Sequence, residues 1–250
     1  MSPQGAPERE VPANAPWFAT THWSVVLAVG HSNSPQAAAA LEKLCRTYWY
    51  PLYAYVRRKG HSPEDAEDLT QEFFARLLKN RDLEAARQEK GRFRSYLLVA
   101  LNHFLANEWK RTRTQKRGGG QALIPLDQTW AEDRYGREPA DPKTAERIFE
   151  QRWATTTLDQ VLTRLREEYA ASGRARQFEG LQSCLSDEPG RRSQAEIATE
   201  LGISEGAVKQ AAHRLRQRYR ELLREAIAQT VATAGDVEDE LRYLIGALRS

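Results

Sequence analysis

Apolar residues recur at spacings of three and four along most of this 250-residue chain, which is the pattern of amphipathic α-helices. Alternating β-branched runs between turn residues, which would indicate strands, do not occur. We therefore predict an all-α fold. The predicted helices cover 34–55, 62–80, 92–117, 144–171, 174–186, 193–201, 204–223 and part of 230–250, and an accessory helix covers 17–29.

Serine followed by proline marks the start of two of these helices. Ser34-Pro35 and Ser62-Pro63 each supply a capping hydroxyl and a residue that fits the first helical position. Pro51 lies inside the first helix, where it removes a backbone donor. We therefore expect Pro51 to kink or split that helix.

A run of glycine and proline divides the helical pattern into two parts. Residues 118–143 hold seven of these residues, beginning with Gly118-Gly119-Gly120. Such a stretch is typical of a flexible linker, so we predict two helical domains joined by a flexible linker. The predicted order is an N-terminal extension at 1–33, a first domain at 34–117, a linker at 118–144, a helix-turn-helix domain at 145–225 and a C-terminal extension at 226–250.

Composition argues against several classes of protein. Cys45 and Cys184 are far apart in sequence, which argues against a disulfide framework or a zinc site and fits a reduced compartment. The five histidines have no metal-ligand spacing, and the phosphate-loop, GxSxG and HExxH motifs do not occur. We expect no catalytic residue, no metal and no cofactor.

No apolar run approaches the ~20 residues of a membrane span, and the first residues lack a secretory pattern. We therefore expect a cytoplasmic protein without a membrane partner. The net charge is only +3, so any nucleic-acid surface must come from basic residues that gather locally.

Residues 193–223 have the spacing of a helix-turn-helix. Ser193 and Glu196 form a capping box, and Gly202 ends the short first helix. Ser204 then caps a second helix, whose first turns would point at base edges. The predicted DNA-binding residues are Ser204, Glu205, Lys209, Gln210, His213 and Arg214, with Arg216, Arg218 and Arg220 suited to phosphates. The alternative is a helical hairpin with a solvated basic face.

The helix at 92–117 has a polar and cationic side. Asn102 could contact a base edge, Ala106 would allow close approach, and Lys110 and Arg113 could hold phosphates. The opposite side, which includes Phe93, forms core by default. The alternative is an ordinary amphipathic helix whose basic end is favoured by the helix dipole.

The helix at 62–80 carries an acidic stripe of Asp65, Asp68 and Glu72 beside an apolar face. Such a stripe could dock a basic partner helix. It could also be a solvated surface, or hold a metal ion as in a nuclease, although no histidine lies in register with the carboxylates.

Together these stretches resemble a bacterial RNA polymerase sigma factor of the extracytoplasmic-function type. The resemblance covers about 36–117 and 145–225. Its most specific parts are SPEDAEDLTQEFFARLL, which is similar to the polymerase-binding helix of that family, and AEIATELGISEGAVKQAAHRLRQRYREL, which is similar to its −35-reading helices. The stretch GRFRSYLLVALNHFLANEWKRTR is similar to the helix that melts promoters and reads the −10 element.

The resemblance implies a role for each surface in transcription initiation. It implies that the clamp helices of the largest polymerase subunit contact Asp65, Asp68, Leu69, Gln71, Glu72 and Phe73. It places −10 DNA at Phe93, Asn102, Ala106, Lys110 and Arg113, and −35 DNA at Lys209, Gln210, His213 and Arg214. Both terminal extensions and SDEPGRR depart from the minimal family pattern.

The function expected from this resemblance is that of a sigma factor, which binds core polymerase and directs promoter-specific initiation without catalysis. The alternative is a stand-alone helix-turn-helix regulator. An anti-sigma factor or another regulator as a further partner stays open.

Overall fold

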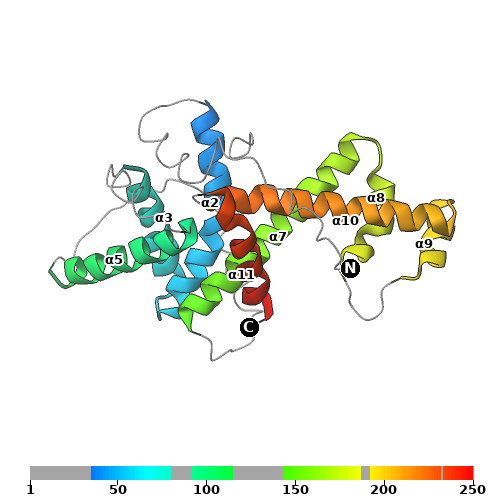
Figure 1. Cartoon of the computed structure of the whole chain (residues 1–250). Coiled ribbons are helices and arrows are strands. Elements are labelled where there is room, and N and C mark those ends of the chain that lie inside the picture. Colours follow the sequence, from blue (N-terminus) through cyan, green and yellow to red (C-terminus); the bar gives the residue numbers. More distant parts are fainter. Residues whose placement is uncertain (1–34, 80–91, 115–143, 187–191, 232, 250) are drawn as a thin grey trace, which may run out of the picture. The chain divides into compact units, whose positions relative to one another are not determined.

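The computed structural model describes residues 35–79, 92–114, 144–186, 192–231 and 233–249 (Figure 1). Within these residues there are helices and no strands, which confirms the predicted all-α fold. The α-helices are α2 (Pro35–Arg58), α3 (Pro63–Lys79), α5 (Phe93–Thr114), α7 (Ala145–Ala171), α8 (Ala175–Leu181), α9 (Gln194–Leu201), α10 (Glu205–Ala228) and α11 (Val237–Arg249). Two short 3₁₀ turns cover Gln182–Leu185 and Ala234–Asp236.

The predicted accessory helix at 17–29 and almost all of the predicted linker lie outside the described residues. None of the described helices is both long enough and apolar enough to span a bilayer.

The chain divides into two compact units whose limits differ from the predicted domains. Met1–Trp153 and Ile227–Ser250 belong to the first unit, and Ala154–Ala226 form the second. The first turns of α7 and the C-terminal extension therefore belong with the residues predicted as the first domain. Contacts of their side chains, described below, account for this assignment.

Helix α2 forms the core of the first unit. From Leu44 to Val56 its side chains are buried, apart from Arg46, which is exposed. The helix continues through Pro51, so the split that the sequence allowed does not occur. Burial of nearly every side chain around Pro51 stabilises the helix by more than the missing backbone hydrogen bond costs.

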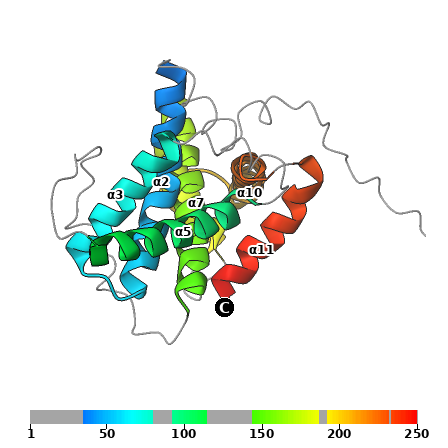
Figure 2. The ribbon, with the colours of Figure 1, turned by 90° about the vertical axis from the view of Figure 1, so that its left-hand side faces the viewer.

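Helices α2, α3 and α5 and the first turns of α7 belong to this unit (Figure 2), and aromatic pairs connect them. Tyr48 packs edge-to-face on Phe93, with ring centroids 5.4 Å apart, which joins α2 to α5. Phe73 of α3 lies 5.8 Å from Phe104 of α5. The first unit is thus organised around rings buried between helices, which supply large apolar contact areas.

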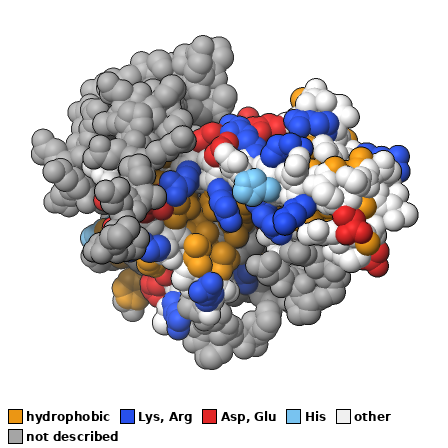
Figure 3. Space-filling view, turned by 45° about the vertical axis from the view of Figure 1, so that its right-hand side comes forward, with side chains coloured by type: hydrophobic (Ala, Val, Ile, Leu, Met, Phe, Trp, Pro, Cys, Tyr) orange, Lys and Arg blue, Asp and Glu red, His pale blue; other side chains and the backbone are white. Residues whose placement is uncertain are grey.

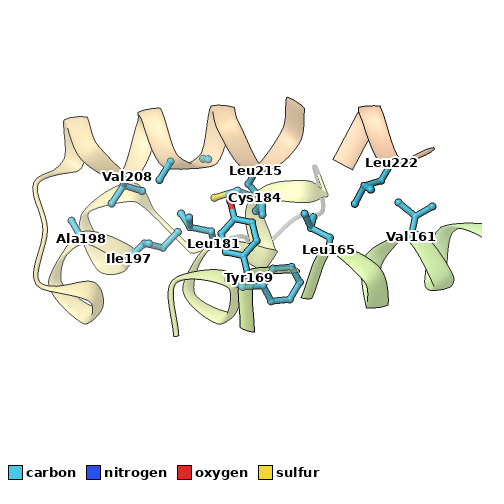
Figure 4. Close-up of a cluster of buried hydrophobic side chains, with 13 residues drawn as sticks. Val161, Leu165, Tyr169, Leu181, Cys184, Ile197, Ala198, Val208, Leu215 and Leu222 are labelled. Atoms are coloured by element: carbon cyan, nitrogen blue, oxygen red, sulfur yellow. The ribbon is translucent and has the colours of Figure 1, made fainter. Parts of the chain in front are cut away.

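The second unit has a separate core, in which α10 covers α7, α8 and α9 (Figure 4). Its buried members are Val161, Leu165, Tyr169, Phe178, Leu181, Cys184, Ile197, Ala198, Val208, Ala211, Ala212, Leu215 and Leu222. Leu201 is only partly buried and Ile203 is 36% exposed, although both side chains are apolar.

The turn between α9 and α10 has the local structure that the sequence predicts. The Ser193 hydroxyl accepts from the Glu196 amide, and the Glu196 carboxylate accepts from the Ser193 amide, which confirms the capping box. Gly202 follows in the left-handed region with φ of 66°. The amide of Ile203 donates to the Ala198 carbonyl at 3.1 Å, as in a Schellman motif. Ser204 then accepts from the Ala207 amide at 3.2 Å and caps α10.

Replacing Gly202 by alanine should destabilise the second unit by about 1 kcal/mol, because a Cβ disfavours positive φ. A Cβ at this position would meet no atom within 4 Å, so the cost comes from the backbone alone. Hydrogen exchange of α9 and α10 amides in urea would measure the loss.

The matched control is Gly206→Ala in the first turn of α10, where the backbone is helical. Alanine has the higher helix propensity there, so this variant should be neutral or slightly stabilising. Equal losses of stability in the two variants would contradict the role of φ at Gly202.

Candidate functional site

The acidic stripe lies on the exposed side of α3. Ser62 accepts from the Asp65 amide at 3.1 Å, which fixes the start of the helix. The side chains of Asp65 and Asp68 are exposed, and Glu72 is partly exposed and receives a hydrogen bond from Arg76 at 2.8 Å. α3 therefore presents carboxylates to solvent while its other side packs in the core.

Negative charges lie close together on this face. Partial burial raises the pKa of Glu67, and the neighbouring Asp68 raises it further, whereas a hydrogen bond from Gln71 opposes the rise. The Gln71 amide donates to Glu67 at 3.0 Å. A cationic partner would relieve this repulsion, because opposite charge favours the ionised carboxylates.

Two of the predicted polymerase contacts lie inward. Phe73 is 3% exposed and packs on Phe74 and Phe104, so it belongs to the core. Leu69 is half-buried at the edge of the acidic face. In the part of the chain that the structure covers, no group of His, Cys, Asp and Glu side chains has the arrangement of a metal site.

The exposed face of α5 combines polar and apolar side chains. Asn102 and Ala106 are both exposed, as the sequence predicts. The side chains of Lys110 and Arg113 lie outside the described parts. Phe93 has no exposed surface, so its ring cannot touch a base in this structure, contrary to the contact that the resemblance implied.

Asn102 already makes two hydrogen bonds. Its Oδ1 accepts from the Tyr55 hydroxyl at 2.7 Å, and its Nδ2 donates to the Leu98 carbonyl at 3.0 Å. An amide has two donor hydrogens and two acceptor positions, so half of its capacity remains for a base edge. The bonds to Tyr55 and Leu98 hold the amide in a defined orientation.

Sequence reasoning missed two exposed apolar residues on the same face. Val99 is 58% exposed and Trp109 is 60% exposed. At 100° per residue they fall in line with Asn102 and Ala106, so the helical period could have identified them. An exposed indole on a polar helix face is a stacking surface for an unpaired base.

In the second unit, all six predicted DNA-binding residues are exposed. Ser204, Glu205, Lys209, Gln210, His213 and Arg214 lie on the first three turns of α10 or at its cap. The spacing of Lys209, Gln210, His213 and Arg214 turns these four away from Val208, Ala212 and Leu215, whereas Ser204 and Glu205 lie at the tip of the helix. Lys and Arg side chains gather on the face that Figure 3 turns toward the viewer, with a histidine among them.

Two arginines predicted to hold phosphates are instead used by the fold. Arg218 donates to both carboxylate oxygens of Glu168, at 2.8 and 2.9 Å. Hydrogen bonds from Arg218 hold the pKa of Glu168 below its ordinary value. Arg216 donates to the Cys184 carbonyl at 2.8 Å. The basic surface is therefore narrower than the sequence suggested.

The departure from the family pattern before α9 also has a structural role. Arg192 donates to the carbonyls of Glu179 and Gly180 at 3.2 and 3.0 Å, and it pairs with Glu200. One guanidinium thus joins the end of α8 to α9. Residues 187–191, which precede it, lie outside the described chain.

Comparison with known proteins agrees with this arrangement. Residues 44–115, which include α3 and α5, match the family model described as sigma-70 region 2. The chain is 28% identical over 209 residues to the protein named ECF RNA polymerase sigma factor SigE of Mycolicibacterium smegmatis. That alignment covers 83% of this chain and 71% of the relative. No solved structure gave a significant match. The chain thus carries a stretch similar to sigma-70 region 2 and, over most of its length, is similar to a sigma factor of the extracytoplasmic-function type.

Proposed function

We propose that the protein directs promoter-specific initiation by binding RNA polymerase core through α3, single-stranded −10 DNA through α5 and −35 duplex DNA through α10. The observation that carries the proposal is the presence, in one unit, of an exposed acidic face and an exposed polar-aromatic face on neighbouring helices. A protein that only bound DNA would not need the acidic face. The chain itself catalyses no reaction, and it works in the cytoplasm beside the polymerase.

The acidic face of α3 would bind a basic helical surface, namely the clamp helices of the largest polymerase subunit. The exposed carboxylates Asp65 and Asp68 supply the charge. Gln71, Glu72 and half-buried Leu69 add polar and apolar contacts around them. Charged pairs at such an interface set the partner and the association rate.

The exposed face of α5 would take the melted −10 strand. Trp109 offers a stacking surface, and Asn102 offers the donors and acceptors that remain after its bonds to Tyr55 and Leu98. Lys110 and Arg113, further along the helix, would hold phosphates. Assembly and captured bases would supply the free energy of melting, which requires no nucleotide hydrolysis.

The first turns of α10 would enter the major groove of the −35 element as the second helix of a helix-turn-helix. Lys209, Gln210, His213 and Arg214 are exposed in positions suited to base edges and phosphates. Glu205 and the cap Ser204 lie at the tip of the helix. Contacts of Arg216 and Arg218 with DNA are not proposed, because the fold already uses both guanidiniums.

Reversing the charge of Asp68 and Glu72 together, as Asp68→Lys with Glu72→Lys, should weaken core binding by at least about tenfold, because like charges would then face the partner. Co-elution with core polymerase and fluorescence anisotropy would measure the loss. The control is Glu42→Lys, an exposed acid on α2 that pairs with Arg46. Wild-type affinity in the double variant would rule out α3 as the docking surface.

Replacing Lys209 by alanine should weaken binding to a −35 duplex by about 1–3 kcal/mol if the side chain contacts a base edge. If it contacts a phosphate, the slope of log K against log salt should fall by roughly one. Titrations of promoter duplexes with holoenzyme over a range of salt would separate the two. Arg242→Ala, which removes an exposed charge of α11, should change neither quantity. Identical behaviour of the Lys209 variant and the wild type would exclude this residue from the interface.

A further inference from the structure

A carboxylate with no exposed surface connects the C-terminal extension to the start of α5. Glu240 of α11 is 0% exposed. Its two oxygens accept from Nε of Arg94 at 2.7 Å and from the terminal nitrogen of Arg94 at 3.2 Å. Nε of Arg92 lies 2.8 Å from the same carboxylate. The buried acid is thus matched by the two arginines on either side of Phe93, the first residue of α5.

The start of α5 is electrostatically unfavourable by itself. Helix N-termini favour acidic residues, because the first amides carry partial positive charge. The first turn of α5 holds no acidic residue, and two arginines flank its first position. Glu240 supplies the missing negative charge from a distant part of the sequence. The Thr230 carbonyl also accepts from the Phe93 amide at 3.0 Å, which satisfies one of the amides that a helix start leaves without a partner.

Aromatic and apolar contacts surround the ion pair. The Arg94 guanidinium lies 3.7 Å from the centroid of the Tyr243 ring and 5.1 Å from that of Trp153. Burial alone would lower the pKa of Arg94, but its bonds to Glu240 more than offset this effect, so the net pKa is raised. The extension buries further side chains in the same unit, namely Ile227, Ala228, Val231, Val237, Leu244 and Ala247.

We infer that residues 227–250 are an integral part of the first unit and that Glu240 is a positioning residue, which fixes the first turn of α5 through Arg92 and Arg94. In this role Glu240 sets how α5 presents Val99, Asn102, Ala106 and Trp109 to the DNA strand. Only the effect on promoter opening rests on the proposed function, in which α5 binds the −10 strand. The structural part stands independently of it.

The contacts favour positioning over a detachable regulatory latch. A latch must leave easily, whereas detaching α11 would expose a buried guanidinium, a buried carboxylate and three buried apolar side chains of α11, and detaching all of 227–250 would expose six. Breaking a buried ion pair leaves an uncompensated charge, which is strongly unfavourable. Detachment would also remove the partner of the Phe93 amide.

The test uses the full chain with Glu240→Met, Arg94→Met and the double variant. In the free protein, hydrogen exchange of the amides in the first turns of α5 should rise by about a hundredfold in Glu240→Met, which leaves Arg94 buried with a weakened set of partners. The double variant should recover most of the protection, because an apolar pair can replace a buried ion pair. The control, Asp239→Asn on the exposed side of α11, should exchange like the wild type.

In complex with core polymerase, Glu240→Met should still co-elute with core but show about tenfold less permanganate reactivity of −10 thymines, because α5 is no longer held in place. The double variant should regain opening. Failure of the wild-type protein to bind core would refute the proposed function. Hydrogen exchange in the free protein would still test whether Glu240 fixes the first turn of α5.

Three results would overturn the inference. Unchanged exchange in Glu240→Met would show that the ion pair does not fix α5. A double variant as unprotected as Glu240→Met would show that the pair itself does not carry the effect. Greater opening than wild type in Glu240→Met would identify the extension as an inhibitory latch.

Discussion

The burial of α2 constrains everything else in the first unit. Almost all side chains from Leu44 to Val56 are buried around the whole circumference of α2. Each neighbouring helix must therefore pack one apolar face against α2. α5 does so with Phe93 against Tyr48, and α5 and α3 pack on each other through Phe104 and Phe73. The faces left over are the acidic side of α3 and the polar-aromatic side of α5. Both candidate interfaces are therefore helix faces that remain exposed after the other faces of α3 and α5 have packed in the core.

Ion pairs decide which charges remain for partners. Arg76 pairs with Glu72 and Glu108, and Arg218 holds Glu168 with two hydrogen bonds. Partly exposed pairs of this kind contribute little stability individually. They do engage guanidinium groups that could otherwise bind DNA phosphates. The number of basic residues in α10 therefore overstates its basic surface, because Arg216 and Arg218 bond to groups of the same unit.

Local rules predicted local structure well. The capping serines, the Gly202 turn and the helical period gave most helix starts and the exposed residues of α10, because each depends on a few neighbouring residues. Tertiary packing decided the rest. Pro51 remained inside a helix because its surroundings are buried, and the role of Glu240 depends on Arg94, which lies 146 residues away in the sequence. No pattern within a single helix of the sequence could indicate that pairing.

The two cysteines have a consequence for redox chemistry. Cys45 and Cys184 are both buried, one in each unit. Burial raises the pKa of Cys45 to about 12, so only about one molecule in 10⁵ carries its reactive thiolate at neutral pH. Oxidants and alkylating reagents should therefore react slowly with Cys45. Because both native cysteines are buried, a cysteine introduced on the surface could carry a spectroscopic label while the native thiols stay in place.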